Sequence, residues 1–276
     1  MTLYAVIAVF GLLVGSFLNV CIVRLPRGGS IVTPPSHCPR CRTPIRYYDN
    51  VPVISFLLLR AKCRSCGEPI SWRYPLVEIA NAACYVWIVR EFGLGGEAGL
   101  MMAFCSSLLV ITLIDYDHQI IPDVITLPGI LIGLAVGPFF LTPLYEPLPF
   151  TLGRLVPHGW PWLTGFLNSV IGMLCGGLPL WLLGWAWEKL RHVEAMGGGD
   201  VKLMGMVGSF LGWKGAFLTI FLGAITGSVV GVGLILFRRH DPDKVIPFGP
   251  FLALGSVLTA FYGPDIVFWY LGLVRT

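Results

Sequence analysis

Long apolar stretches run through almost the whole of this chain, and they restrict its fold more than any other feature of the sequence. A membrane-spanning helix needs about 17–25 predominantly apolar residues, and most of these stretches have that length. Only 12% of the 276 residues are charged, which is about half the share found in a typical soluble domain. We therefore expect an all-α polytopic protein of the lipid bilayer with about eight transmembrane helices, near residues 3–23, 75–92, 98–114, 123–141, 162–187, 200–212, 215–237 and 248–272.

The basic residues predict how these helices are oriented, because loops rich in lysine and arginine stay in the cytoplasm. The loop 24–74 carries nine basic residues, and placing it in the cytoplasm puts fifteen of the nineteen lysines and arginines on that side. Both termini then lie outside. The formal net charge of +4 follows from this loop bias, so we expect no nucleic-acid partner. The other six cytoplasmic basic residues are Lys189, Arg191, Lys202, Arg238, Arg239 and Lys244.

Two aspartates in strongly apolar surroundings are the candidate catalytic residues. Asp115 ends the apolar run 108–114, and Asp200 follows three glycines at 197–199. Ionisable residues at the edge of the hydrocarbon are costly, and their default interpretation is functional. The predicted orientation puts both aspartates near the cytoplasmic face. Two carboxylates at one depth can share a proton and activate water, as they do in aspartic proteases.

Helix capping is the competing interpretation for some of these acids. Asp123 follows Pro122 and precedes an apolar stretch, so we expect it to be the N-cap of the fourth span. Asp200 could cap the sixth span, although the three preceding glycines give the backbone more freedom than a cap needs. Lys202 could bias which acid holds the shared proton, or its side chain could extend to the lipid headgroups.

The loop 24–74 contains two C-x-x-C pairs with twenty-one residues between them. Such pairs are typical of a four-thiolate zinc site, here formed by Cys38, Cys41, Cys63 and Cys66. Two disulfides are the alternative, but a reducing cytoplasm disfavours them. An internal repeat supports two similar metal-binding knuckles, since Cys38, Cys41, Pro44, Ile45 and Tyr47 recur 25 residues later as Cys63, Cys66, Pro69, Ile70 and Trp72.

These features divide the chain into three expected parts. Residues 1–23 form the first transmembrane helix, residues 24–74 a small cytoplasmic zinc-binding loop domain, and residues 75–276 a membrane aspartic peptidase domain. A loop of about fifty residues has too little core to fold unaided, so zinc binding should supply much of its folding free energy. Four thiolates leave no open position for a catalytic water, and the zinc is therefore expected to be structural.

With these residues assembled, the chain resembles the type IV prepilin peptidases, which are bifunctional leader peptidase/N-methyltransferases and membrane aspartic proteases of the GxGD type. The resemblance covers nearly the whole chain. It rests on several ordered motifs: Gly15–Val20, the two C-x-x-C pairs, Tyr48–Pro52, Arg73–Glu78, Leu113–Asp115, Ile121–Asp123, the G-x-G-D element Gly197–Asp200 with Lys202, and Pro247–Phe251.

The resemblance implies a specific activity in the bacterial inner membrane. Family members cut the basic leader from prepilins and pseudopilins after a glycine at the cytoplasmic membrane face, and they methylate the new amino terminus with S-adenosylmethionine. Their catalytic aspartates match Asp115 and Asp200. The cysteine loop is typically absent from peptidase-only relatives, which favours the bifunctional form. No Rossmann-like glycine motif locates the methyl-donor site, so its residues stay unknown. Asn19 and Glu78 are candidates, but we do not assign them to the site.

Two alternatives stay open at the level of sequence. One is a peptidase without methyltransferase activity, whose cysteine loop is only structural. The other is a membrane transporter or receptor that uses the zinc loop for docking and the intramembrane acids for ion binding. The position of both acids near one face, rather than at the midplane, argues against the second alternative.

Overall fold

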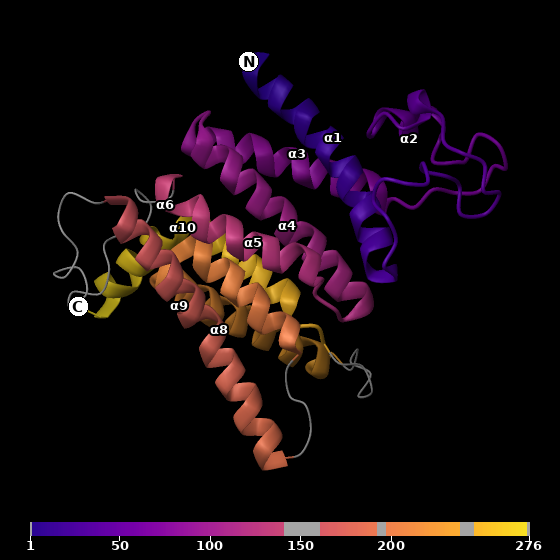
Figure 1. The fold of residues 1–276 in the computed structure, drawn as a ribbon. Helices are drawn as coiled ribbons and strands as arrows, with labels where there is room; N and C mark the ends of the chain where they lie inside the picture. Colours follow the sequence, from indigo (N-terminus) through magenta and orange to yellow (C-terminus); the bar gives the residue numbers. More distant parts are fainter. Residues whose placement is uncertain (1, 141–160, 192–196, 238–245, 275–276) are drawn as a thin grey trace. The chain divides into compact units, whose positions relative to one another are not determined.

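The computed structural model describes residues 2–140, 161–191, 197–237 and 246–274 (Figure 1). Three basic residues used for the predicted orientation, Arg238, Arg239 and Lys244, lie outside these ranges. The chain divides into two compact units, Met1–Val110 and Ile111–Thr276. The described ranges contain helices and two isolated β-bridges, and no strand. The expected division at residues 23 and 74 differs from these unit boundaries and stays a prediction.

The first unit is built on two antiparallel helices, α1 (Thr2–Arg24) and α3 (Arg73–Phe92). Gly11 and Gly15 let the backbones approach closely, since an added Cβ would lie 2.6 Å from Ala82 Cα and 2.7 Å from Glu78 Cα, respectively. Small residues four apart are a common device for packing membrane helices. The loop between α1 and α3 holds the 3₁₀ turns η1 (Leu25–Arg27) and η2 (Tyr47–Asp49) and the short helix α2 (Ile54–Leu58).

Helix α4 (Gly96–His118) begins in the first unit and ends in the second. The second unit continues with α5 (Asp123–Ala135), α6 (Gly137–Phe140), α8 (Pro161–Arg191), α9 (Gly198–Leu236) and α10 (Gly249–Val274). Helix α9 is central, because α5, α8 and α10 all pack against it. Glycines of α8 and α9, such as Gly176 and Gly208, leave no room for a Cβ against the partner backbone. Close backbone contact of this kind replaces the hydrophobic effect, which is absent between helices in lipid.

Helix α9 is interrupted at Gly212, whose φ of 69° and ψ of −179° are not helical. The side-chain amide of Asn168 on α8 packs against this glycine, at 2.8 Å from the position of an added Cβ. A left-handed φ is readily adopted only by glycine, so Gly212 separates the two halves of the 39-residue helix. The break coincides with the expected boundary between the sixth and seventh spans.

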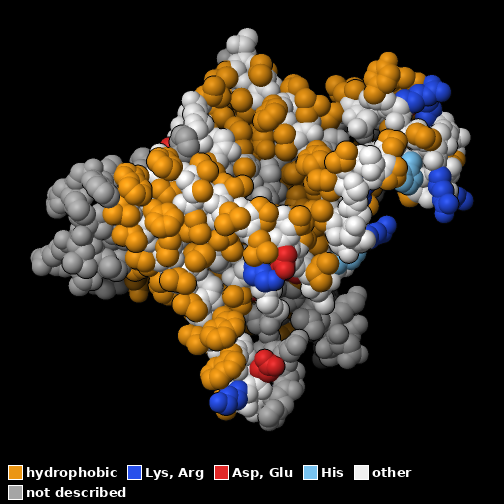
Figure 2. Space-filling model, viewed as in Figure 1, with side chains coloured by type: hydrophobic (Ala, Val, Ile, Leu, Met, Phe, Trp, Pro, Cys, Tyr) orange, Lys and Arg blue, Asp and Glu red, His pale blue; other side chains and the backbone are white. Residues whose placement is uncertain are grey.

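These helices cover the eight expected apolar stretches except Val136, Phe237 and Phe248, which lie just outside helix ends, and residue 141, which lies outside the described ranges. Five are long and apolar enough to cross a membrane: Thr2–Arg27, Gly96–His118, Trp162–Arg191, Gly198–Leu236 and Gly249–Leu273. Large aliphatic and aromatic side chains are exposed along them, and hydrophobic atoms cover most of the described surface in Figure 2. The prediction of an all-α polytopic membrane protein is confirmed.

Candidate active site and cysteine cluster

Asp115 lies in the last turn of α4 and is buried, with 6% of its surface exposed. Its Oδ2 atom accepts a hydrogen bond from the backbone N–H of Gly249 at 3.0 Å. Gly249 is the first residue of α10, so this bond joins two segments that are 134 positions apart in the chain. The final turn of α4 closes with a bond from the Gln119 N–H to the Asp115 carbonyl at 2.9 Å.

Asp200 lies in the first turn of α9. The N-cap of this helix is Gly197, in an extended conformation with φ −66° and ψ 139°, and no side chain caps the helix. The capping interpretation of Asp200 therefore has no support in the structure. A carboxylate in the first turn of a helix is stabilised by the helix dipole, so α9 can hold an anionic aspartate at this position.

The two aspartates lie in the same part of the second unit. Asp200 directly follows Gly199, and Asp115 accepts the hydrogen bond of the Gly249 amide. Ile121, in the connection between α4 and α5, packs against both neighbouring glycines. A Cβ added at Gly199 would lie 2.9 Å from Ile121 Cβ, and one added at Gly249 would lie 3.3 Å from Ile121 Cδ1. The ends of α4, α9 and α10 therefore converge around this isoleucine.

Gly249 is the residue of this site that sequence reasoning missed. A Cβ at position 249 would lie only 2.5 Å from Asp115 Oδ2, so glycine is needed for the amide to reach the carboxylate. The only signal in the sequence was the Pro247–Phe251 motif, which belongs to the family resemblance. The motif gave no indication of which group this glycine contacts.

Lys202 and Asp123 form an ion pair next to this site. The Lys202 ammonium donates to both carboxylate oxygens of Asp123 at 2.7 Å. The prediction that Asp123 caps its helix is wrong, because Pro122 is the N-cap of α5 and no side chain caps it. Both side chains of the pair are about half exposed, and exposed pairs contribute little stability. Lys202 thus connects α9 to α5.

The four cysteines of the loop lie together, and each pair of their Sγ atoms is within 4.8 Å. The Sγ atoms of Cys38 and Cys66 are 3.8 Å apart. Zinc–sulfur bonds of about 2.3 Å in a tetrahedron require sulfur–sulfur distances of about 3.8 Å. The four residues therefore fit a four-thiolate metal centre, and the cysteine set predicted from the sequence is the one that the fold brings together.

The internal repeat is present in the backbone, residue for residue. Matching hydrogen bonds recur 25 positions apart: Cys38 N–H to Thr43 O and Cys63 N–H to Glu68 O, then Arg42 N–H to Cys38 O and Gly67 N–H to Cys63 O. The isolated bridges His37–Pro44 and Lys62–Pro69 follow the same repeat. The two halves therefore share the same backbone hydrogen-bonding pattern.

The chemistry of the donor set also fits a cation. Hydrogen bonds from the Thr43 side chain and amide lower the pKa of Cys41 to about 6, and the amides of Cys66 and Ser65 lower the pKa of Cys63. The Glu68 amide favours the Cys66 thiolate, but desolvation and the neighbouring cysteines raise the pKa of Cys66 to about 11. Four crowded sulfurs cannot all ionise without a cation to balance them.

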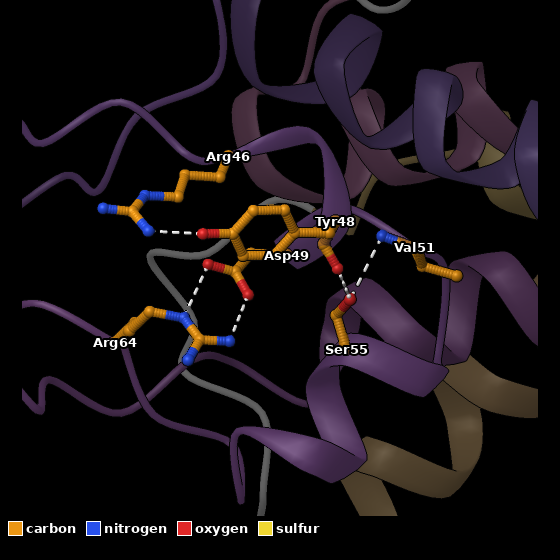
Figure 3. A network of polar contacts seen from close by, with 6 residues as sticks. All are labelled: Arg46, Tyr48, Asp49, Val51, Ser55 and Arg64. Carbon is orange, nitrogen blue, oxygen red and sulfur yellow. Dashed lines mark hydrogen bonds and ion pairs between the residues drawn. The ribbon is translucent and has the colours of Figure 1, made fainter.

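Polar contacts connect the two knuckles with the segment between them (Figure 3). Arg40 of the first knuckle pairs with Glu68 of the second. Arg64 donates to both oxygens of Asp49 at 2.8 and 2.6 Å, and this contact lowers the pKa of Asp49. Arg46 donates to the Tyr48 hydroxyl. The Arg64–Asp49 contact thus connects the second knuckle to η2.

Taken together, the fold and these two groups define a polytopic membrane protein with aspartates at two helix ends and a cysteine loop suited to a metal. Comparison with known proteins identifies the class. Residues 9–92 match the Bacterial Peptidase A24 N-terminal domain, and residues 102–232 match the Type IV leader peptidase family. The chain belongs to the type IV leader peptidase family.

Several relatives match along almost their whole length. A prepilin leader peptidase/N-methyltransferase of Aeromonas salmonicida is 35% identical over 98% of this chain and 94% of its own length. Proteins of the same name from Pseudomonas aeruginosa and Burkholderia pseudomallei are 34% and 33% identical over 95% and 92% of this chain, and over 91% and 84% of their own lengths. No solved structure is a significant match. Together with the five apolar helices, these relatives indicate an inner-membrane protein.

Proposed function

We propose that this protein removes the leader peptide from prepilins and pseudopilins and then methylates the new amino terminus. The family membership and the near full-length similarity to prepilin leader peptidase/N-methyltransferases carry this conclusion. Its substrates have a basic leader followed by an apolar helix. Such a helix would enter the bilayer and leave the scissile bond, after a glycine, at the membrane interface.

Asp115 and Asp200 are the proposed catalytic pair. The ionised aspartate takes a proton from the attacking water, and the protonated one donates a hydrogen bond to the scissile carbonyl. When the bond breaks, the aspartate that accepted the proton returns it to the leaving amine. The Gly249 amide, bonded to Asp115 Oδ2 at 3.0 Å, fixes the orientation of one carboxylate throughout. The convergence of the ends of α4, α9 and α10 around Ile121 supports the assignment.

Cys38, Cys41, Cys63 and Cys66 would hold a structural zinc ion, which supplies a rigid crosslink between the two knuckles. S-adenosylmethionine is the proposed methyl donor, and when bound it supplies an electrophilic methyl group for the new amine. We assign no residue to its site. The active site and the cysteine loop are proposed to face the cytoplasm, on the basis of the predicted distribution of basic residues.

One assay tests both activities. Purified protein is mixed with a full-length prepilin, with or without S-adenosylmethionine, and the products are identified by mass spectrometry. Asp115→Asn and Asp200→Asn should each abolish cleavage, while Asp265→Asn, at an exposed aspartate of α10, should cleave normally. Cleavage by either catalytic variant at the wild-type rate would refute the pair. Cleaved but unmethylated product in the presence of S-adenosylmethionine would leave a peptidase without methyltransferase activity.

A further inference from the structure

The short helix α2 of the cysteine loop presents an apolar face that is largely exposed in the described structure of the first unit. Ile54, Leu57 and Leu58 are 56%, 61% and 77% exposed. Positions i, i+3 and i+4 share one face of a helix, so these side chains form a single apolar face. Figure 2 shows hydrophobic side chains gathered where Figure 1 places α2.

The opposite side of α2 is fixed to the loop. Ser55 donates to the Tyr48 carbonyl at 2.9 Å and accepts from the Val51 amide at 3.1 Å (Figure 3). Phe56 is buried, and its ring packs edge-on against Trp72 with centroids 4.7 Å apart. Because these contacts hold one side of the helix, the orientation of its exposed apolar face is determined.

A second contact sets the level of α2 along the membrane helices. The Val53 amide, at the start of α2, donates to Glu78 Oε2 at 2.8 Å. Glu78 is buried and lies five residues into α3, which is about 7.5 Å along the helix axis from Arg73. Val53 has a φ of 60°. A β-branched residue keeps such a conformation only where its surroundings impose it.

The neighbouring helix α1 also lies against this glutamate. A Cβ added at Gly15 would lie 2.7 Å from Glu78 Cα, and Gly15 lies nine residues before the end of α1, about 13.5 Å along its axis. Helix α1 is apolar enough to cross the membrane. The start of α2 therefore lies alongside a membrane-spanning helix, at a level closer to the middle of the bilayer than Arg24 and Arg73.

We propose that α2 is an interfacial helix that inserts Ile54, Leu57 and Leu58 into the bilayer at the boundary between headgroups and acyl chains. Interfacial helices bury an apolar face about 5–10 Å into this boundary, which matches the level set by Glu78. Leu76 and Ile79, on either side of Val77 and Glu78 in α3, are also apolar and exposed. Trp72 is 64% exposed at the start of α3, a position typical of the aromatic belts of membrane proteins.

The basic residues that follow α2 fit the same partner. Arg60 and Lys62 are exposed, and they come directly after the apolar face in the chain. Their positive charges would lie at the headgroups, where they attract anionic phospholipids. The second cysteine knuckle begins at the next residue, Cys63. Insertion of α2 would thus hold the metal-binding knuckles against the membrane surface, beside the helices that carry them.

Photocrosslinking of the full-length protein tests this proposal. A p-benzoylphenylalanine is placed at position 57 or 58, and the purified protein is irradiated in nanodiscs of phosphatidylethanolamine and phosphatidylglycerol. The control position is 32, because Val32 is also apolar, is 79% exposed and lies beyond the end of α1. We expect the protein mass to rise by one phospholipid for positions 57 and 58, with only background adduct for position 32.

Other occupants of the apolar face give different masses. A crosslink to a second copy of the chain, a crosslink to added prepilin, or equal lipid adduct at position 32 would each overturn the proposal, and so would the absence of a lipid adduct. Melting temperatures of the labelled proteins verify that they are folded. If position 58 does not accept the label, position 54 on the same face replaces it.

Discussion

The hydrogen bond from the Gly249 amide to Asp115 predicts that Gly249→Ala strongly impairs cleavage without removing any catalytic group. The new methyl carbon would lie 2.5 Å from Asp115 Oδ2, 3.1 Å from Asp115 Cγ and 3.3 Å from Ile121 Cδ1. The carboxylate must therefore rotate away, and it loses the 3.0 Å bond that orients it.

The size of the effect follows from the bond that is lost. A hydrogen bond to a charged group contributes about 1.5–3 kcal/mol, which corresponds to a decrease of roughly 10- to 150-fold in rate if the bond is needed in the transition state. Displacement of Asp115 and Ile121 should also lower the free energy of unfolding by about 1–3 kcal/mol, as crowded core substitutions do. The assay is the initial rate of prepilin cleavage at saturating substrate, together with the melting temperature.

Gly263→Ala is the matched control, since Gly263 lies on the same helix. There the added Cβ would meet Leu218 and Thr259 at 3.6 Å, which is ordinary van der Waals contact. We expect normal cleavage and equal or higher stability, because alanine favours a helix over glycine. Wild-type cleavage by Gly249→Ala would refute the orienting role of this amide. An equal loss in both variants would show that the effect is not specific to Asp115.

Three further predictions concern the rest of the site and the loop. Gly199→Ala should impair cleavage, because the added Cβ would lie 2.9 Å from Ile121 Cβ. Gly198→Ala is the control and should cleave normally, because the space around Gly198 is open. Equal cleavage rates for the two variants would contradict the role of Ile121 packing. Cys63→Ser should release zinc, measured by elemental analysis, whereas Cys175→Ser should retain it, and unchanged zinc in both would refute the four-thiolate centre. The ion pair with Arg64 lowers the pKa of Asp49 from its ordinary 3.8. The stabilisation of the loop by this pair is therefore complete above pH 3.8, and it is lost as the pH falls through the lower pKa of the folded protein. Hydrogen exchange should show a difference between wild type and Asp49→Asn that is constant from about pH 7 to 5 and disappears under stronger acid; a difference that grows in acid would reverse the argument.

Much of the fold could be predicted from the sequence because membrane helices carry their signal locally. The length and hydrophobicity of each apolar stretch located all eight helical segments, and Gly212 lies where two spans were separated. The two cysteine knuckles could be predicted for the same reason, since the cysteine spacing and the 25-residue repeat can be read directly from the sequence. Helix α2 was not predicted, because five residues are too few to show a periodicity.

The contacts between distant segments could not be predicted in this way. The bond from Gly249 to Asp115 and the pair of Lys202 with Asp123 each depend on how separate helices pack, over 134 and 79 positions. The glycine at 249 is explained only by the carboxylate beside it. Asp123 has the residue type of a helix cap, but Pro122 occupies the cap position, and Lys202 on α9 is the partner of Asp123.

The central claim is that Asp115 and Asp200 act together on a single substrate carbonyl and water. An experimental structure of the protein bound to a prepilin-like peptide tests it most directly. In this peptide, a tetrahedral carbon that bears a hydroxyl replaces the scissile carbonyl group. We expect that hydroxyl within hydrogen-bonding distance of both carboxylates. A hydroxyl that contacts only one of them, with the other facing away from the peptide, would contradict the paired mechanism.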